Sequence, residues 1–153
     1  MIVSASAAER ERFAERLLDG RMLLSVAKVR TLLEGRVAEE EIESRAQEVL
    51  DAAVAKRLEA NQTVTLVADG LDGAERERYV RMAHASRRPR HLILLEAARE
   101  DVADDDLATL NELRRRLDAG ELGGEGFQTA VRIGGDAVGE LKRIVFQRPP
   151  RDE

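Results

Sequence analysis

The sequence predicts an α/β domain in which a mainly parallel five-stranded sheet lies between helices. Three observations lead to this fold class. Short apolar runs rich in branched side chains alternate along the chain with longer segments of helical periodicity. The run at 91–95 is continuously apolar, as is typical of strands buried on both faces. The 153 residues, 43% of them hydrophobic, suffice for one domain with its own core.

Strands are expected where apolar runs are bounded by turn residues. These runs cover 2–5, 22–26, 63–68, 91–95 and 127–133. A further run at 141–147, after Gly134-Gly135, is a candidate for a sixth strand that runs antiparallel to the others. We expect residues 1–148 to form the single domain and the charged residues 149–153 to form a tail.

Helices are expected where apolar residues recur every three or four positions. They are predicted after the first strand up to Gly20, at 27–34, in a long segment after Glu39–Glu41, at 73–86 and after Asp104–Asp106. Asp72 is the expected N-cap of the helix at 73–86. The long helix should bury Ile42, Ala46, Val49 and Ala53, with Leu50, Val54 and Leu58 beside them.

Composition excludes several classes of site. Cysteine is absent, which excludes disulfides and thiolate metal centres, and only two histidines are present. Asp101 and Asp104–Asp106 match no calcium-binding loop and suit the cap and first turn of a helix, so no metal site is predicted. No apolar run approaches the ~20 residues of a membrane span, and the first residues lack the order of a signal peptide. We therefore expect a cytoplasmic protein with no membrane partner.

One short basic cluster stands out in a chain of net charge −5. Arg87, Arg88, Arg90 and His91 precede the apolar run at 91–95. Contact with nucleic acid or phosphate is one interpretation of this cluster. The acidic balance of the whole chain and its bias toward arginine favour the other interpretation, a solvated surface loop.

Six segments, taken in order, resemble one known family. They are FAERLL (13–18), LLSVAKVRTLLEG (23–35), KRLEANQTVTLVAD (56–69), ERERYVRMA (75–83), RPRHLILLEA (88–97) and EGFQTAVRI (125–133). Together they resemble the P-loop kinase domain of the bacterial polynucleotide-kinase type, which is itself similar to zeta-toxin and other small AAA-like ATP-binding kinases. The resemblance covers nearly the whole chain. It implies a three-layer P-loop-kinase-like fold and, in active members, ATP with Mg²⁺ as the cofactor.

The phosphate loop of that family is altered in this chain. Where the family has G-x-x-x-x-G-K-[ST] after the first strand, residues 4–12 contain no glycine. Glu9 stands at the second glycine position, Arg10 at the lysine position and Glu11 at the position of the Mg²⁺-binding hydroxyl. Glycine permits the inward-turned N–H groups of a phosphate cradle, whereas alanine and glutamate mostly do not. We expect instead a short, tight connection and a helix that begins near Ser6.

The other family signatures are altered as well. Ala27 stands where L-S-S-D-x-x-R has its general base, although Arg30 is retained. The Asp of T-V-V-D-A-T-N is either replaced by Ala68 or shifted by one residue to Asp69. The arginine-rich lid expected after the fourth strand has little room between residues 95 and 104. Arg99 is the one arginine in this stretch that could hold a phosphate as the lid does.

Two hypotheses of function follow from these four changes. The first is a non-catalytic protein that keeps the kinase fold as a scaffold for binding, with another protein chain or a second copy as partner and no cofactor. Phosphoryl transfer depends on positioning and charge stabilisation, so losing cradle, hydroxyl, base and lid together favours this hypothesis over an enzyme. The alternative is a kinase or nucleotide binder that holds ATP with Mg²⁺ at a divergent site made of Arg10, Arg30 and Asp69.

Overall fold

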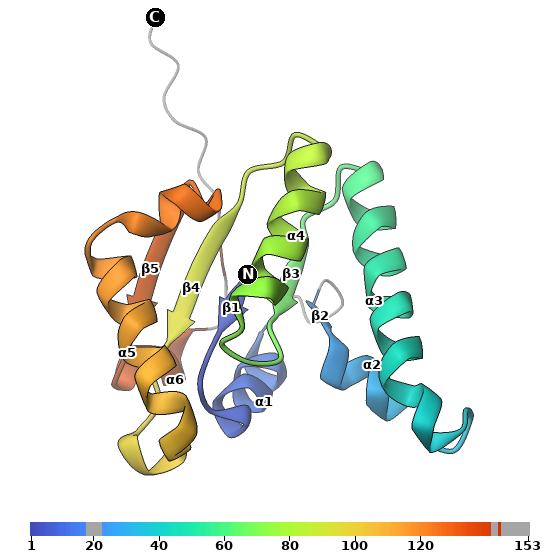
Figure 1. Ribbon diagram of the computed structural model, residues 1–153, viewed down its shortest axis with the longest axis horizontal. Coiled ribbons are helices and arrows are strands. Elements are labelled where there is room, and N and C mark those ends of the chain that lie inside the picture. Colours follow the sequence, from blue (N-terminus) through green and yellow to red (C-terminus); the bar gives the residue numbers. More distant parts are fainter. Residues whose placement is uncertain (18–22, 142–143, 145–153) are drawn as a thin grey trace, which may run out of the picture.

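The computed structural model describes residues 1–17, 23–141 and 144. Within these residues, five strands form one sheet in the order β2-β3-β1-β4-β5, and every neighbouring pair is parallel (Figure 1). The strands are β1 Ile2–Val3, β2 Leu23–Ser25, β3 Thr65–Val67, β4 His91–Leu95 and β5 Thr129–Ile133. In the register of the sheet, Ile2 stands between Val67 and Ile93. The predicted parallel α/β sheet is thus confirmed.

Helices cover both faces of the sheet and make three layers. In Figure 1, α3 (Ile42–Glu59), α4 (Gly73–Ala85) and α5 (Asp104–Asp118) lie in front of the strands, and α1 (Ala7–Arg16) lies behind them. The remaining helices are α2 (Val26–Leu33) and the short α6 (Asp136–Glu140), with 3₁₀ turns at Glu39–Glu41, Arg99–Asp101 and Glu121–Glu125. In the described part of the chain, no helix is both long and apolar enough to span a bilayer.

The pleat of the central strand divides the core between the two faces. Ile2 packs with Phe13 of α1 on one face, and Val3 packs with Leu110 of α5 on the other. Because successive side chains of a strand point to opposite faces, a strand of two residues serves both layers. All four side chains are at most 1% exposed, so β1 lies at the centre of the molecule.

The long helix begins after Glu41 as predicted but does not bury its whole predicted stripe. In α3 the buried side chains are Ala46, Leu50, Val54 and Leu58, which are four residues apart. Val49 is 47% exposed, so its predicted burial is wrong. On a helix of 3.6 residues per turn, residues four apart lie on nearly the same side, whereas Val49 lies ~100° around the helix from Leu50. Because the row that contains Leu50 faces the core, Val49 faces solvent.

Two predicted helix starts differ in how they are capped. Asp72 caps α4 as expected, because its side chain accepts a hydrogen bond from the N–H of Ala74 at 3.0 Å. In α5 the N-cap is Ala103, without a side-chain hydrogen bond, and Asp104–Asp106 occupy the first turn. These carboxylates therefore complement the helix dipole and do not cap the helix.

The C-terminal region holds a helix that the sequence pattern did not predict. The turn of α6 ends at Glu140, and Leu141 is its C-cap. Most of the candidate sixth strand at 141–147 and all of the charged tail at 149–153 lie outside the described residues. The antiparallel strand therefore stays a prediction. Helix α1 ends at Arg16, with Leu17 as its extended C-cap, so its predicted end at Gly20 is wrong.

Candidate functional site

The direction of the connections places a crevice at the carboxyl end of the sheet. From β1 the chain passes through α1 to β2 on one side, and from β4 it passes through α5 to β5 on the other. In open α/β sheets, ligands bind where connections diverge in this way, outside the carboxyl ends of the strands. A pocket of about 740 Å³ lies at this point, between α1, the segment after β4 and α6.

The connection from β1 to α1 is short and tightly hydrogen-bonded. It comprises only residues 4–6, and α1 begins at Ala7, which confirms the expected helix start. The hydroxyl of Ser6 accepts from the N–H of Glu9 at 3.2 Å, and the hydroxyl of Ser4 accepts from the N–H of Ser6 at 3.3 Å. Both serines are at most 3% exposed. Two N–H groups of the segment where a phosphate cradle was expected, those of Ser6 and Glu9, are thus bonded within the protein.

Arg10 turns back against this same connection. Its Nη1 donates to the carbonyl oxygen of Ser4 at 2.8 Å. The side chain at the expected lysine position therefore closes the turn. Its charge still contributes, after the larger effect of Arg30, to keeping the pKa of the Asp69 carboxyl below its usual value.

Arg30 and Asp69 form a direct ion pair beside Arg10. Arg30 Nη1 and Nη2 donate to the two carboxylate oxygens of Asp69 at 3.0 Å and 2.7 Å. The same guanidinium also donates to both oxygens of Glu43, at 2.7 Å each. These hydrogen bonds lower the pKa of both carboxyls.

The structure thus pairs Arg30 with Asp69 directly, whereas Arg10 bonds to Ser4 and affects Asp69 only through its charge. It also identifies Asp69 as the acidic residue after β3, because Ala68 is buried in the core at 1% exposure. Asp69 lies beyond the end of β3, so its side chain need not follow the alternation of the strand.

A further acidic residue at this edge was not predicted. Both carboxylate oxygens of Glu75 accept from the N–H of Asp69, at 2.9 Å and 3.1 Å. Burial raises the pKa of Glu75. Glu75 follows the N-cap Asp72 by three residues, which is the spacing of a capping box and could have indicated it. With Glu43 and Asp69, this edge holds three carboxylates against the guanidiniums of Arg10 and Arg30.

The pocket at the crevice is also of mixed charge. Glu9 pairs with Arg12 on α1, and its Oε2 is buried without a hydrogen-bond partner in the described structure. Glu96, just after β4, accepts from Arg114 Nε at 3.0 Å and 3.1 Å and lies 3.3 Å from Arg132 Nε. Carboxylates thus line the crevice at the carboxyl end of the sheet.

The chemistry available at this edge is that of a closed charge network. A carboxyl such as Asp69, with a lowered pKa and a guanidinium on both oxygens, is a weak proton acceptor. Ala27, at the position where the resemblance implies a general base, has no titratable group. Among the described residues, no three histidine, aspartate or glutamate side chains gather closely enough to hold a metal ion.

Comparisons with known proteins add no identity to this geometry: no protein-family model matches the chain, and no curated protein matches it.

Proposed function

We propose that this protein is a non-catalytic binding protein, or scaffold, with a P-loop-kinase-like fold in which the phosphate site has been replaced by internal contacts. One observation carries the proposal. The connection between β1 and α1 has three residues. The hydroxyls of Ser4 and Ser6 accept hydrogen bonds from backbone N–H groups of the same segment, and Arg10 donates to the carbonyl oxygen of Ser4. A cradle that encloses a phosphate needs free, convergent N–H groups.

The charges at this edge support the same function. Arg30 is shared between Glu43 and Asp69, so one cation faces two anions. A nucleotide would have to displace these carboxylates and then withstand their repulsion. Glu9, which stands in the first turn of α1, would add to that repulsion.

The proposed partner is another protein chain or a second copy of this one. The large exposed apolar side chains Leu32, Val49 and Val131 lie on α2, α3 and β5. β5 is an edge strand in the described sheet, and such edges are templates for pairing with another chain. Light scattering after size exclusion tests the second copy: pairing through β5 predicts a dimer that Val131→Lys converts to a monomer.

The decisive experiment is a calorimetric titration with MgATP, repeated with MgGTP. We expect no heat of binding at millimolar nucleotide and no protection against thermal unfolding. Binding at micromolar affinity would contradict the proposal. In that case Arg10→Ala and Arg30→Ala would identify the site, with Arg45→Ala, from an exposed pair on α3, as the control.

A divergent nucleotide site is the second candidate, because Arg30 and Asp69 meet at the carboxyl end of the sheet and the charge of Arg10 acts on Asp69 there. This candidate requires Arg30 to exchange Glu43 for phosphate while Asp69 stays part of the site. It therefore predicts that Glu43→Gln strengthens nucleotide binding and that Asp69→Asn weakens it, whereas the non-catalytic proposal predicts no binding by either variant.

A further inference from the structure

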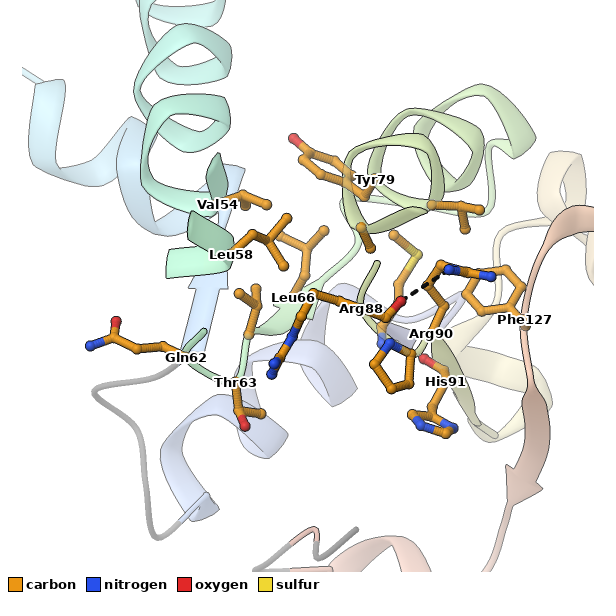
Figure 2. A pocket seen from close by; sticks show the side chains of 15 residues that line it. Val54, Leu58, Gln62, Thr63, Leu66, Tyr79, Arg88, Arg90, His91 and Phe127 are labelled. Carbon is orange, nitrogen blue, oxygen red and sulfur yellow. Dashed lines mark hydrogen bonds between the residues drawn. The ribbon is translucent and has the colours of Figure 1, made fainter. Parts of the chain in front are cut away.

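A second cavity lies at the amino end of the sheet, away from the carboxyl-end residues described above. It lies between α3 and α4, where β1, β3 and β4 begin, and has a volume of about 540 Å³ (Figure 2). Apolar side chains form its walls: Val54 and Leu58 from α3, Leu66 from β3, Val80 from α4 and Phe127. Size and lining are those of a site for a small organic molecule, typically roughly 300–1,000 Å³.

The charged groups around this cavity are all basic. Arg88 and Arg90 line it together with His91, whose pKa is lowered by burial, and among the described residues no aspartate or glutamate lines it. Since the whole chain carries a net charge of −5, this local excess is opposite in sign to the rest of the protein. An anionic ligand is therefore favoured over a cationic or neutral one.

Two of the three basic side chains have structural partners. Arg90 donates from Nε to the carbonyl oxygen of Gly126 at 2.7 Å and from Nη1 to that of Arg88 at 3.0 Å, the contact drawn as a dashed line in Figure 2. The ring Nδ1 of His91 lies 2.7 Å from the hydroxyl of Thr129. These contacts hold the loop and the start of β4 in place.

Arg88 is different, because its guanidinium has no hydrogen-bond or ionic partner among the described residues. Its side chain is half-buried, and Figure 2 shows it extending across the cavity toward Thr63, below Leu58 and Leu66. The backbone that carries it is fixed, since the N–H of Arg88 donates to Ala83 at the end of α4 at 2.8 Å. A partly desolvated cation without an anion is costly unless a ligand supplies one.

We propose that this cavity binds a small amphipathic carboxylate, with its hydrocarbon body between α3 and α4 and its carboxylate on Arg88. A single planar guanidinium matches a carboxylate with two parallel hydrogen bonds. The hydroxyl of Thr63 lies on the side to which Arg88 extends. The site goes beyond the proposed scaffold function and is independent of the carboxyl edge, so nucleotide titration does not test it.

The protein contains its own probe for this site. Tyr79 is the only tyrosine, the chain has no tryptophan, and Tyr79 lines the cavity. Its hydroxyl points toward α3, donating to Asp51 at 3.0 Å and accepting from Gln47 at 2.7 Å, so the ring is fixed (Figure 2). Tyrosine emission therefore comes from a single residue in the cavity wall.

Decanoate, titrated below its micelle-forming concentration, is the test ligand, followed by tyrosine emission and by calorimetry. We expect saturable binding that Arg88→Gln weakens about tenfold or more. Arg87→Gln is the matched control, since Arg87 is exposed and does not line the cavity, and it should bind decanoate like the unaltered protein. Ala83→Leu, which fills the cavity from α4, should abolish binding while the helical circular dichroism is kept.

Ligands with the same tail and other head groups test the charge. Decanol and decyltrimethylammonium should bind at least tenfold more weakly than decanoate. Absence of decanoate binding, equal binding of all three compounds, or binding that is unchanged in Arg88→Gln would overturn the proposal. Decyl phosphate distinguishes the head groups: tighter binding of this dianion than of decanoate would contradict the assignment to carboxylates.

Discussion

Arg30, on α2, and Asp69, just after β3, are joined by two hydrogen bonds of 3.0 Å and 2.7 Å across the carboxyl end of the sheet. Arg30 belongs to the helix that follows β2, and Asp69 belongs to the segment between β3 and α4, so the pair links these two parts of the chain. Glu43, at the start of α3, binds the same guanidinium. In the resemblance to P-loop kinases, these positions belong to phosphate chemistry. Here they connect three elements to one another.

Removing the charge of Asp69 should destabilise the protein modestly. The side chains of Arg30 and Asp69 are 28% and 39% exposed, so solvent screens part of the attraction. We expect Asp69→Asn to lower the free energy of unfolding by about 1 kcal/mol. Urea denaturation measures the change. Glu48→Gln, which alters a 65% exposed partner of Arg45, is the matched control and should leave the midpoint unchanged.

The cost of Asp69→Asn should depend on pH in a defined direction. Hydrogen bonds from Arg30 lower the pKa of Asp69 in the folded protein. Its stabilising contribution is therefore complete above the unfolded pKa of ~3.9 and is lost as pH falls through the lower, folded pKa. Urea midpoints of the two proteins should differ by a constant amount above about pH 5 and converge below about pH 4. A difference that grows on acidification would contradict this role for the pair.

Glu75 should matter as a hydrogen-bond acceptor more than as a charge. Glu75→Ala leaves the N–H of Asp69 without its acceptor, at a cost of about 2 kcal/mol. Glu75→Gln keeps an amide oxygen there and should cost less than half as much. Urea denaturation at neutral pH compares the two, and equal losses would show that the carboxylate charge is what matters.

The same residue predicts a pH effect of opposite sign to that of Asp69. Burial raises the pKa of Glu75, so the folded protein holds this proton more tightly than the unfolded chain does. The contribution of Glu75 to stability therefore declines as pH rises from ~4.3 through the folded pKa. Glu75→Gln should lack this decline, and urea midpoints measured from about pH 4 to pH 7 would reveal the difference.

Strand positions followed from the sequence, whereas strand lengths did so only in part. The strand at 91–95 begins and ends as predicted, because its apolar run is bounded by Arg90 and Glu96. The run at 63–68 forms a ladder only over Thr65–Val67, because pairing requires a partner strand and β2 extends over three residues. α6 was not predicted, since five residues flanked by glycine are too few for a helical period to show.

The candidate site was predictable only for residues that the family resemblance names. Arg10, Arg30 and Asp69 were selected in this way; Arg30 and Asp69 pair directly, whereas Arg10 bonds to Ser4. Glu43 was not, because its contact with Arg30 depends on how α3 packs against α2, which no local pattern encodes. The open guanidinium of Arg88 likewise emerges only when the partners of each arginine are known, since the sequence cannot distinguish it from Arg87 or Arg90.

The corrected stripe of α3 leads to a test of the helix layer. Leu50 on α3 is 1% exposed, whereas Leu32 on the adjoining α2 is 57% exposed. Leu50→Ala removes the same atoms as Leu32→Ala but leaves a cavity, and it should lower the free energy of unfolding by about 3 kcal/mol. Leu32→Ala should change it by less than about 0.5 kcal/mol. Chemical denaturation measures both, and similar losses would mean that Leu32 is covered in solution, as by a second copy of the chain.

A last matched pair tests the turn that leads into β5. Gly126 has φ +105°, and a Cβ there would lie 2.7 Å from Cγ1 of Val80 on α4, a contact that must be relieved by movement. Gly124, two residues earlier, has open space around its would-be Cβ and no positive φ. Gly126→Ala should therefore lower the melting temperature by several degrees, and Gly124→Ala should leave it nearly unchanged.

Because the carbonyl of Gly126 accepts from Arg90 at 2.7 Å, the Gly126 variant should also weaken decanoate binding at the neighbouring cavity. Equal melting temperatures for the two variants would show that the turn relaxes freely and does not fix the cavity wall.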